Sequence, residues 1–439
     1  MPDSLTIQLV NQTTSSNVYA YITGLALQRD CARVLLKADG KGLHYPASPA
    51  GGKILQPLAE DCAIALGAPG NTATVTIPQI AGGRIWFSAG ERKLTFLLNP
   101  GGPGGGAALV EPSVLNPSDP NAGVDFCFCE FTLNSDQLFA NISYVDFVAR
   151  LPIALTLRTR TGAVQHVSGM PADGLTRVCD GLCAQAARDG RPWDKLIVSR
   201  DGQPLRVLSP THGEAVGASF TGYFEPLVDA AWQRYREQQQ AEARGRAQGE
   251  PQKHGPNLLA RLEAKAQGQG PDQQQAQQSQ QPSAGCALLR INTQAAAGIV
   301  TGSVAAQSDE LILAGESFKR PTTADILGCN SGPFTTGPSA TRNAIIPRLA
   351  AAFQRSAIAA DGVDEHPSQP DTFYRCEPTN HYSRVVHAAN LDGKGYSFAY
   401  DDVQPDGGAD QSGKVNAGDP DVFVVAVGGG GAYVGDRMP

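Results

Sequence analysis

The chain has 439 residues, an apolar fraction of 41% and a formal net charge of −7. The negative charge and the absence of a Lys/Arg cluster argue against a nucleic-acid partner, and no apolar run reaches the roughly 18 residues of a membrane span. The 49 glycines and 31 prolines suit a turn-rich β protein. This length allows two domains, or one large domain with insertions.

Short segments of alternating apolar and polar residues dominate the first 158 residues. Clusters of Gly, Pro, Asn and Asp separate them, which is typical of an antiparallel sandwich or barrel. We expect strands at residues 6–10, 18–22, 33–36, 74–77 and 84–87.

Residues 126–134 and 141–148 alternate in the same way, and the short link between them predicts a β-hairpin. A turn centred near Leu138 would place Glu130 roughly opposite Asp146, with about 5 Å between their Cβ atoms. Two carboxylates held so close are costly. Glycoside hydrolysis requires such a pair, one as acid and the other as base or nucleophile.

Strand parity sorts the side chains around Glu130 onto two faces. One set is uniformly apolar and belongs in the core: Cys127, Cys129, Phe131 and Leu133. The opposite set then faces a cleft or solvent: Phe128, Glu130, Thr132 and Asn134. On the return strand Tyr144 and Asp146 share a face.

Residues 159–370 have a mixed α/β pattern. Helices are expected at 173–187, 226–235 and 347–355, the last two opened by proline, and strands at 196–199 and 205–208. The glutamine-rich stretch 237–284 holds few large apolar residues, so we predict a disordered insertion.

Strand patterns return after residue 371, at 384–387, 396–400 and 422–427. Because both chain ends form strands, we expect one discontinuous β domain of residues 1–158 and 371–439. The mixed α/β domain, residues 159–370, would be inserted into it.

The segments 130–134 (EFTLN) and 141–147 (NISYVDF) resemble the catalytic region of glycoside hydrolase family 64. Further familial segments follow in the right order, at 109–112, 116–121, 327–334, 346–349, 380–382 and 395–403. The resemblance covers most of the chain except the glutamine-rich stretch. It implies a β-1,3-glucanase, including the laminaripentaose-producing type, with a thaumatin-like β-sandwich or barrel and a mixed α/β domain flanking a wide cleft.

By this resemblance Glu130 is the general acid and Asp146 the general base of an inverting enzyme. Inversion needs carboxyl groups roughly 6.5–9.5 Å apart, whereas a directly opposed pair lies nearer to retaining geometry. Either the hairpin register is offset or the two side chains diverge.

The resemblance also implies residues that hold the sugar. Phe139 stands where related enzymes can carry tryptophan, so it offers a smaller apolar platform; packing at the hairpin tip is its alternative role. For the acidic pair at 401–402 the alternative is a turn or strand-end cap. The resemblance implies Thr132, Asn134 and Phe139, and the residue pattern adds Tyr144, Asp401 and Asp402 as candidate sugar-binding residues.

The sequence therefore predicts a monomeric endo-β-1,3-glucanase that binds β-1,3-glucan and needs no metal or organic cofactor. No Cys/His spacing suits zinc, and no nucleophile elbow is present. The N-terminus lacks a signal-peptide pattern, although the substrate suggests a secreted or wall-associated protein. The alternatives are a non-catalytic thaumatin-like β-glucan-binding protein and a structural protein that associates through its glutamine-rich segment.

Overall fold

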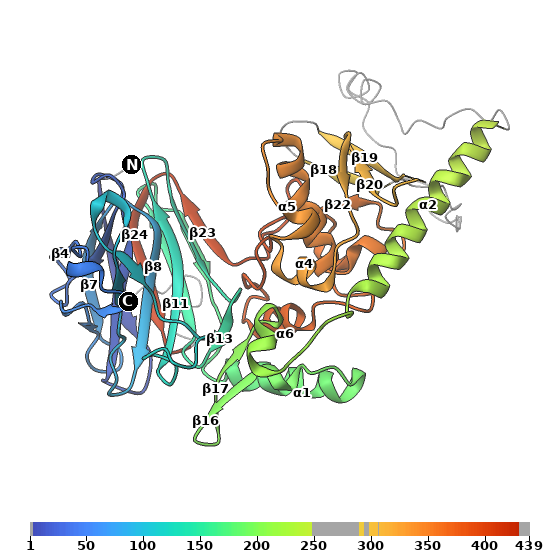
Figure 1. Ribbon diagram of the computed structural model, residues 1–439. Helices are drawn as coiled ribbons and strands as arrows, with labels where there is room; N and C mark the ends of the chain where they lie inside the picture. Colours follow the sequence, from blue (N-terminus) through green and yellow to red (C-terminus); the bar gives the residue numbers. More distant parts are fainter. Residues whose placement is uncertain (1–2, 248–288, 294–297, 306, 430–439) are drawn as a thin grey trace, which may run out of the picture.

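The computed structural model describes residues 3–247, 289–293, 298–305 and 307–429. The chain forms a β lobe and a second lobe that carries the helices (Figure 1). Among the described residues no helix has the length and apolar character to cross a bilayer.

Two sheets build the β lobe. The smaller sheet has the order β15-β14-β24-β1-β7, with β1 Ser4–Asn11, β7 Thr72–Pro78, β14 Ile153–Thr159, β15 Val164–Val167 and β24 Pro420–Val427. The larger sheet has the order β23-β12-β11-β8-β2-β3-β4, with β6 beside β2. Its strands are β2 Val18–Ala26, β3 Ala32–Leu36, β4 Leu43–His44, β6 Ile64–Ala65, β8 Ile80–Ala89, β11 Asp125–Leu133, β12 Leu138–Ile142 and β23 Lys414–Ala417.

The core of the β lobe lies between these sheets. Ile7 and Phe423 of the smaller sheet share one buried cluster with Ile85 and Cys129 of the larger sheet. Four alternate residues of β11 enter this cluster, as strand parity predicts: Cys127, Cys129, Phe131 and Leu133. The mainly β fold and the strands expected at residues 6–10, 18–22, 33–36, 74–77 and 84–87 are confirmed.

The hairpin β11–β12 forms, but its register differs from the prediction. Leu133 pairs with Leu138, and Glu130 pairs with Asn141 rather than with Asp146. The turn is shorter than expected because the Asn134 side chain accepts hydrogen bonds from the backbone N–H groups of Asp136 and Gln137. Asp146 therefore lies beyond the end of β12.

The second lobe combines helices with two further sheets, ordered β13-β17-β16 and β21-β20-β19-β18-β22. The strands are β13 Phe147–Ala149, β16 Ile197–Arg200, β17 Gln203–Leu208, β18 Leu289–Asn292, β19 Ile299–Val304, β20 Leu311–Leu313, β21 Glu316–Phe318 and β22 Glu365–His366. The helices are α1 Gly174–Asp189, α2 Glu225–Ala247, α4 Thr323–Gly328, α5 Ala340–Gln354 and α6 His381–Ala389. A small sheet of β5 Gln56–Pro57, β9 Leu97–Asn99 and β10 Ala108–Val110 lies in the N-terminal part of the chain.

Several local predictions in the C-terminal half are wrong. Residues 384–387 belong to helix α6, which Asn380 caps by accepting from the Ser383 N–H. Residues 396–400 form no strand; within them only Tyr396 makes an isolated bridge, to Ser143. Helix α5 begins at Ala340 after the cap Ser339, so Pro347 lies inside it.

The predicted domain boundaries fall inside structural units. Residue 158 lies in β14, and β15 pairs with it in the smaller sheet of the β lobe. The chain after residue 371 first forms helix α6, where Val385 contacts α1 at Gly181. Disorder was predicted for the whole glutamine-rich stretch. Helix α2 continues through its residues 237–247, which are therefore helical. The remainder of that stretch lies outside the described residues.

Candidate active site

A row of polar residues crosses the larger sheet at Glu130. Its neighbours on the adjacent strands are Asn141 on β12 and Arg84 on β8. Thr23 on β2 is in turn the cross-strand neighbour of Arg84. Cross-strand neighbours on one face lie about 5 Å apart at Cβ, so these side chains form one continuous strip.

Arg84 connects Glu130 of this strip to a second carboxylate, Glu111. Its Nε and one terminal nitrogen donate to Oε1 of Glu130 at 3.2 and 3.0 Å, and its other terminal nitrogen donates to Glu111 at 2.6 Å. Although burial opposes the charge, Glu111 and Glu130 raise the pKa of Arg84. Thr23 fixes Glu111 by donating to it at 3.0 Å. Both bonds to Glu130 end on Oε1, which leaves Oε2 for a ligand.

An open groove of about 440 Å³ lies over this strip. Gly82 and Gly83 lie at irregularities in the pairing of β8, and Gly82 adopts a φ of 51°. Glycine is suited to such a conformation and leaves the surface without a side chain. The groove is lined by Leu25, Arg33, Gly82, Gly83, Arg84, Glu111, Glu130, Phe131, Thr132, Phe139 and Asn141.

Replacing Gly83 by alanine is expected to destabilise the protein by about 1–3 kcal/mol. A Cβ there would lie 2.4 Å from the ring of Phe131, which is buried in the core cluster of the β lobe. Urea unfolding measures the effect. Gly82→Asn is the control, because nothing lies within 4 Å of its Cβ position and Asn tolerates a positive φ. Equal stability of the Gly83→Ala variant and the native protein would contradict this account of the groove floor.

Asp146 lies in the connection between β12 and β13, where groups of the second lobe hold it. Its backbone oxygen accepts from the Ser209 N–H at 2.9 Å, and its Oδ1 lies 2.9 Å from Nε2 of His212. The hydrogen bond from His212 is the main cause that lowers the pKa of Asp146; burial opposes it, and Arg84 adds to it. Asp146 is therefore a carboxylate that stays ionised in mild acid, and its side chain is 44% exposed.

The two predicted catalytic carboxylates act on one common cation. Arg84 hydrogen-bonds to Glu130, and the charge of Asp146 also contributes to raising the pKa of Arg84. Tyr396 stands near the same place: Glu130 is among the charges that raise its pKa, after burial and Asp402. The register thus separates Glu130 from Asp146 along the sheet, and side-chain electrostatics still link them.

The predicted sugar-binding residues divide into four groups, of which the last, Tyr144 and Asp401, is buried. Thr132 and Phe139 face each other across β11 and β12 and line the groove. Asp402 is half-buried and accepts from the Tyr396 hydroxyl at 3.2 Å. Asn134 uses its side-chain oxygen in the hairpin turn, which is a structural role.

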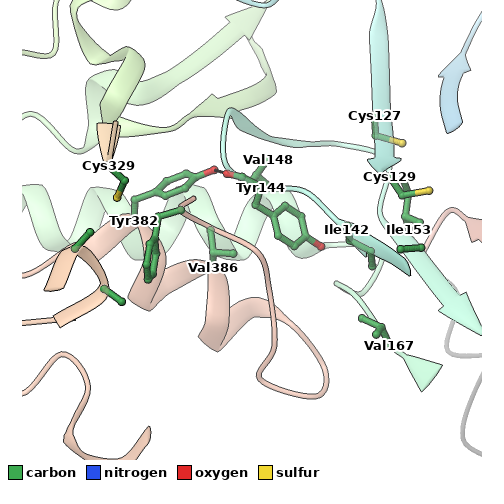
Figure 2. Packing of buried hydrophobic residues seen from close by; sticks show 14 of the residues in the cluster. Cys127, Cys129, Ile142, Tyr144, Val148, Ile153, Val167, Cys329, Tyr382 and Val386 are labelled. Atoms are coloured by element: carbon green, nitrogen blue, oxygen red, sulfur yellow. Dashed lines mark hydrogen bonds between the residues drawn. The ribbon is translucent and has the colours of Figure 1, made fainter. Parts of the chain in front are cut away.

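Tyr144 and Asp401 are buried and do not reach the groove. Tyr144 is 6% exposed, its hydroxyl donates to Asn390, and its backbone oxygen accepts from Tyr382 at 2.6 Å (Figure 2). Asp401 is 1% exposed and accepts from Arg355 and His387 at 3.0 Å. Neither can contact a sugar in this structure, because both side chains are enclosed by protein.

Asp401→Asn is expected to lower the free energy of unfolding by about 3–5 kcal/mol at neutral pH, because it leaves the buried Arg355 without its counter-ion. Burial alone would raise the pKa of Asp401, but His387 and Arg355 lower it, so the carboxylate is ionised there. Chemical denaturation tests this. The neighbouring Asp402→Asn serves as control and should change stability little. Equal losses in both variants would contradict the prediction.

Sequence reasoning missed Arg84, Glu111, His212 and Tyr396 as site residues. Arg84 is the one charged residue of the apolar strand segment 84–87, and Glu111 and Tyr396 lie in familial segments. His212 lies in the segment 211–214, whose residue pattern is too generic to assign a role. Within the described chain, no group of three or more His, Cys, Asp or Glu side chains is placed to hold a metal ion.

Comparisons with known proteins place this site in a family context. The family described as Beta-1,3-glucanase, glycoside hydrolase 64, matches residues 3–279 and 286–427. The glucan endo-1,3-beta-glucosidase of Cellulosimicrobium cellulans is 26% identical over 416 residues, which are 92% of this chain and 62% of that protein. The chain thus spans less than two thirds of this curated relative.

Solved structures match over nearly the whole chain. A laminaripentaose-producing beta-1,3-glucanase in complex with laminaritetraose is 26% identical, with a TM-score of 0.73, and the match covers 97% of this chain and 99% of that one. A beta-1,3-glucanase domain from Clostridium beijerinckii, 19% identical with a TM-score of 0.64 over 97% and 98% of the two chains, shares the fold. Since the family match extends over far more than half of the sequence, the chain belongs to glycoside hydrolase family 64, the beta-1,3-glucanases.

Proposed function

We propose that this protein is an endo-acting β-1,3-glucanase that inverts anomeric configuration, with Glu130 as general acid and Asp146 as general base. Family membership and the names of the relatives support the substrate. One observation carries the assignment of roles: Glu130 lines the groove with one free oxygen, while Asp146 lies beyond the end of β12, held by different partners.

The surroundings of Glu130 suit a group that gives up a proton. In the forward step Oε2 of Glu130 protonates the glycosidic oxygen as the C1–O bond breaks. The carboxylate that forms is stabilised by Arg84, which already donates two hydrogen bonds to Oε1. Glu111 shares the Arg84 cation, so part of its charge is balanced before the reaction.

The surroundings of Asp146 suit a group that accepts a proton. His212 occupies Oδ1, which leaves Oδ2 to accept a proton from a water molecule that attacks C1 from the opposite face. The pKa of Asp146 is lowered mainly by the hydrogen bond from His212, so Asp146 is ionised in mild acid. The two carboxyl groups thus have different partners, Arg84 for Glu130 and His212 for Asp146.

The groove suits a polysaccharide. From Phe139 on β12 to Arg33 on β3 it crosses four interstrand spacings, roughly 19 Å, which is long enough for more than one pyranose ring. Phe139 offers an apolar face for a sugar, and Thr132 beside it offers a hydroxyl for hydrogen bonds. The groove is open to solvent, which fits cleavage within a chain.

Release of reducing ends from soluble β-1,3-glucan tests the proposal. We expect oligosaccharides from β-1,3-glucan and none from β-1,4-glucan or α-glucan of similar size. Glucan binding is measured in parallel by affinity electrophoresis. Binding without hydrolysis would overturn the enzyme proposal in favour of a glucan-binding protein.

A further inference from the structure

The connection that carries Asp146 is held by the second lobe on several sides. The Tyr144 N–H donates to the Tyr396 backbone oxygen at 2.7 Å, and the Tyr382 hydroxyl donates to the Tyr144 backbone oxygen. The Ser209 N–H then binds the Asp146 backbone oxygen. Glu130, by contrast, lies within a strand of the β lobe. The separation of the two carboxylates therefore depends on how the lobes are joined.

Among the described residues, the one hydrogen bond to the Asp146 carboxylate itself comes from His212, in the short helix Pro210–Val216. Nε2 of His212 lies 2.9 Å from Oδ1 of Asp146. An ionised carboxylate only accepts hydrogen bonds, so Nε2 carries the hydrogen. That short helix is itself fixed, because the Thr211 hydroxyl donates to the Leu327 backbone oxygen at 2.9 Å.

We propose that His212 is the positioning residue of the general base: it fixes Oδ1 of Asp146 from the second lobe and thereby directs Oδ2 toward the attacking water. This inference rests on the proposed function. In the step, the water proton passes to Oδ2 while the water oxygen bonds to C1, and the leaving oxygen takes the Glu130 proton. His212 keeps its own proton and remains hydrogen-bonded to Asp146 throughout.

The ionisable groups that act on Asp146 come from three elements: His212, Arg84 of β8 and Tyr382 of α6. Arg84 is shared with Glu111 and Glu130, so its influence is divided. Loss of His212 removes the main cause that lowers the pKa of Asp146. A larger fraction of the base is then protonated in acid, and the acid limb of the activity profile moves to higher pH.

The test compares kcat/KM against pH for the native protein, His212→Ala, His212→Gln and Glu214→Gln. We expect His212→Ala to lose about 10- to 100-fold in kcat with little change in KM, and its acid limb to move to higher pH. His212→Gln keeps a donor and should recover most of the loss. Glu214→Gln, an exposed position on the same short helix, should match the native profile.

A uniform loss in His212→Ala with an unmoved acid limb would overturn the inference, because a merely structural role predicts that result. If this variant fails to fold, His212→Gln decides: its acid limb should stay close to the native one, and a large upward movement would contradict the donor role.

A ¹³C-carboxyl NMR titration gives a readout without activity, with Asp146→Asn identifying the Asp146 signal. The signal should titrate at higher pH in His212→Ala than in the native protein, and identical titrations would contradict the inference. If the native protein cleaves no glucan and the titrations still differ, the proposed function fails while the His212 contact stands.

Discussion

Glu130→Gln is expected to lower kcat on β-1,3-glucan by about 10²- to 10⁴-fold, the usual contribution of a general acid. Glutamine keeps the shape and can still accept from Arg84, but it has no proton to give to the glycosidic oxygen. Glucan binding should change only a few-fold, because the groove and Phe139 are untouched. Initial rates of reducing-end release measure the loss, and binding is followed by affinity electrophoresis.

Glu91→Gln is the matched control for this prediction. Glu91 is an exposed acid outside the groove, so its replacement should leave kcat unchanged. A Glu130→Gln enzyme that retained more than about a tenth of native activity would contradict the assignment of Glu130 as acid, given that magnitude.

Asp146→Ala is expected to reduce kcat by a similar factor, about 10²- to 10⁴-fold, because no group then accepts the proton of the attacking water. Azide is already an anionic nucleophile and needs no base. Added azide should therefore restore turnover in Asp146→Ala and yield a glycosyl azide, which mass spectrometry detects.

The two variants should respond in opposite ways to chemical rescue. A β-linked aryl glucoside with a good leaving group needs no protonation, so it should be cleaved at a near-native rate by Glu130→Gln and poorly by Asp146→Ala. Azide should rescue only Asp146→Ala. Rescue of Glu130→Gln by azide on unactivated glucan would mean that the acid and base are assigned the wrong way round.

The hairpin shows how far local sequence determines this site. Alternation predicted the first strand and placed Cys129 and Glu130 on opposite faces, since side-chain direction follows from strand period alone, but the second strand forms at Leu138–Ile142 rather than over residues 141–148. The register of the hairpin is set by the length of its turn. The Asn134 side chain shortens this turn by accepting hydrogen bonds from backbone N–H groups. The sequence Asn-Ser-Asp at residues 134–136 is typical of a turn, so the sequence contained the information needed to place the turn correctly.

The position of Asp146 could not be predicted in the same way. Strand β12 ends at Ile142 because the next residues bind a distant segment at Tyr396, a contact across about 250 positions of sequence. His212 approaches Asp146 from another separate segment. Such pairings arise from tertiary packing, and a pattern of residue types does not record them.

The strand predicted at residues 384–387 was wrong for a related reason. Residues 384–387 carry two valines and read as a strand, yet the Asn380 cap and packing against α1 make them helical. Asp401 resembled a substrate ligand in sequence, and only its contacts with Arg355 and His387 reveal its structural role. A buried ion pair and an exposed one look alike in a sequence.

The most direct test of the account is the anomeric form of the first product. The native protein is incubated with soluble β-1,3-glucan, and ¹H NMR follows the anomeric protons within the first minutes, before mutarotation. We expect the α-anomer to appear first and the β-anomer to grow only by mutarotation, because Asp146 would activate a water molecule that attacks C1 directly. Initial appearance of the β-anomer would contradict it, because the enzyme would then act through a covalent intermediate.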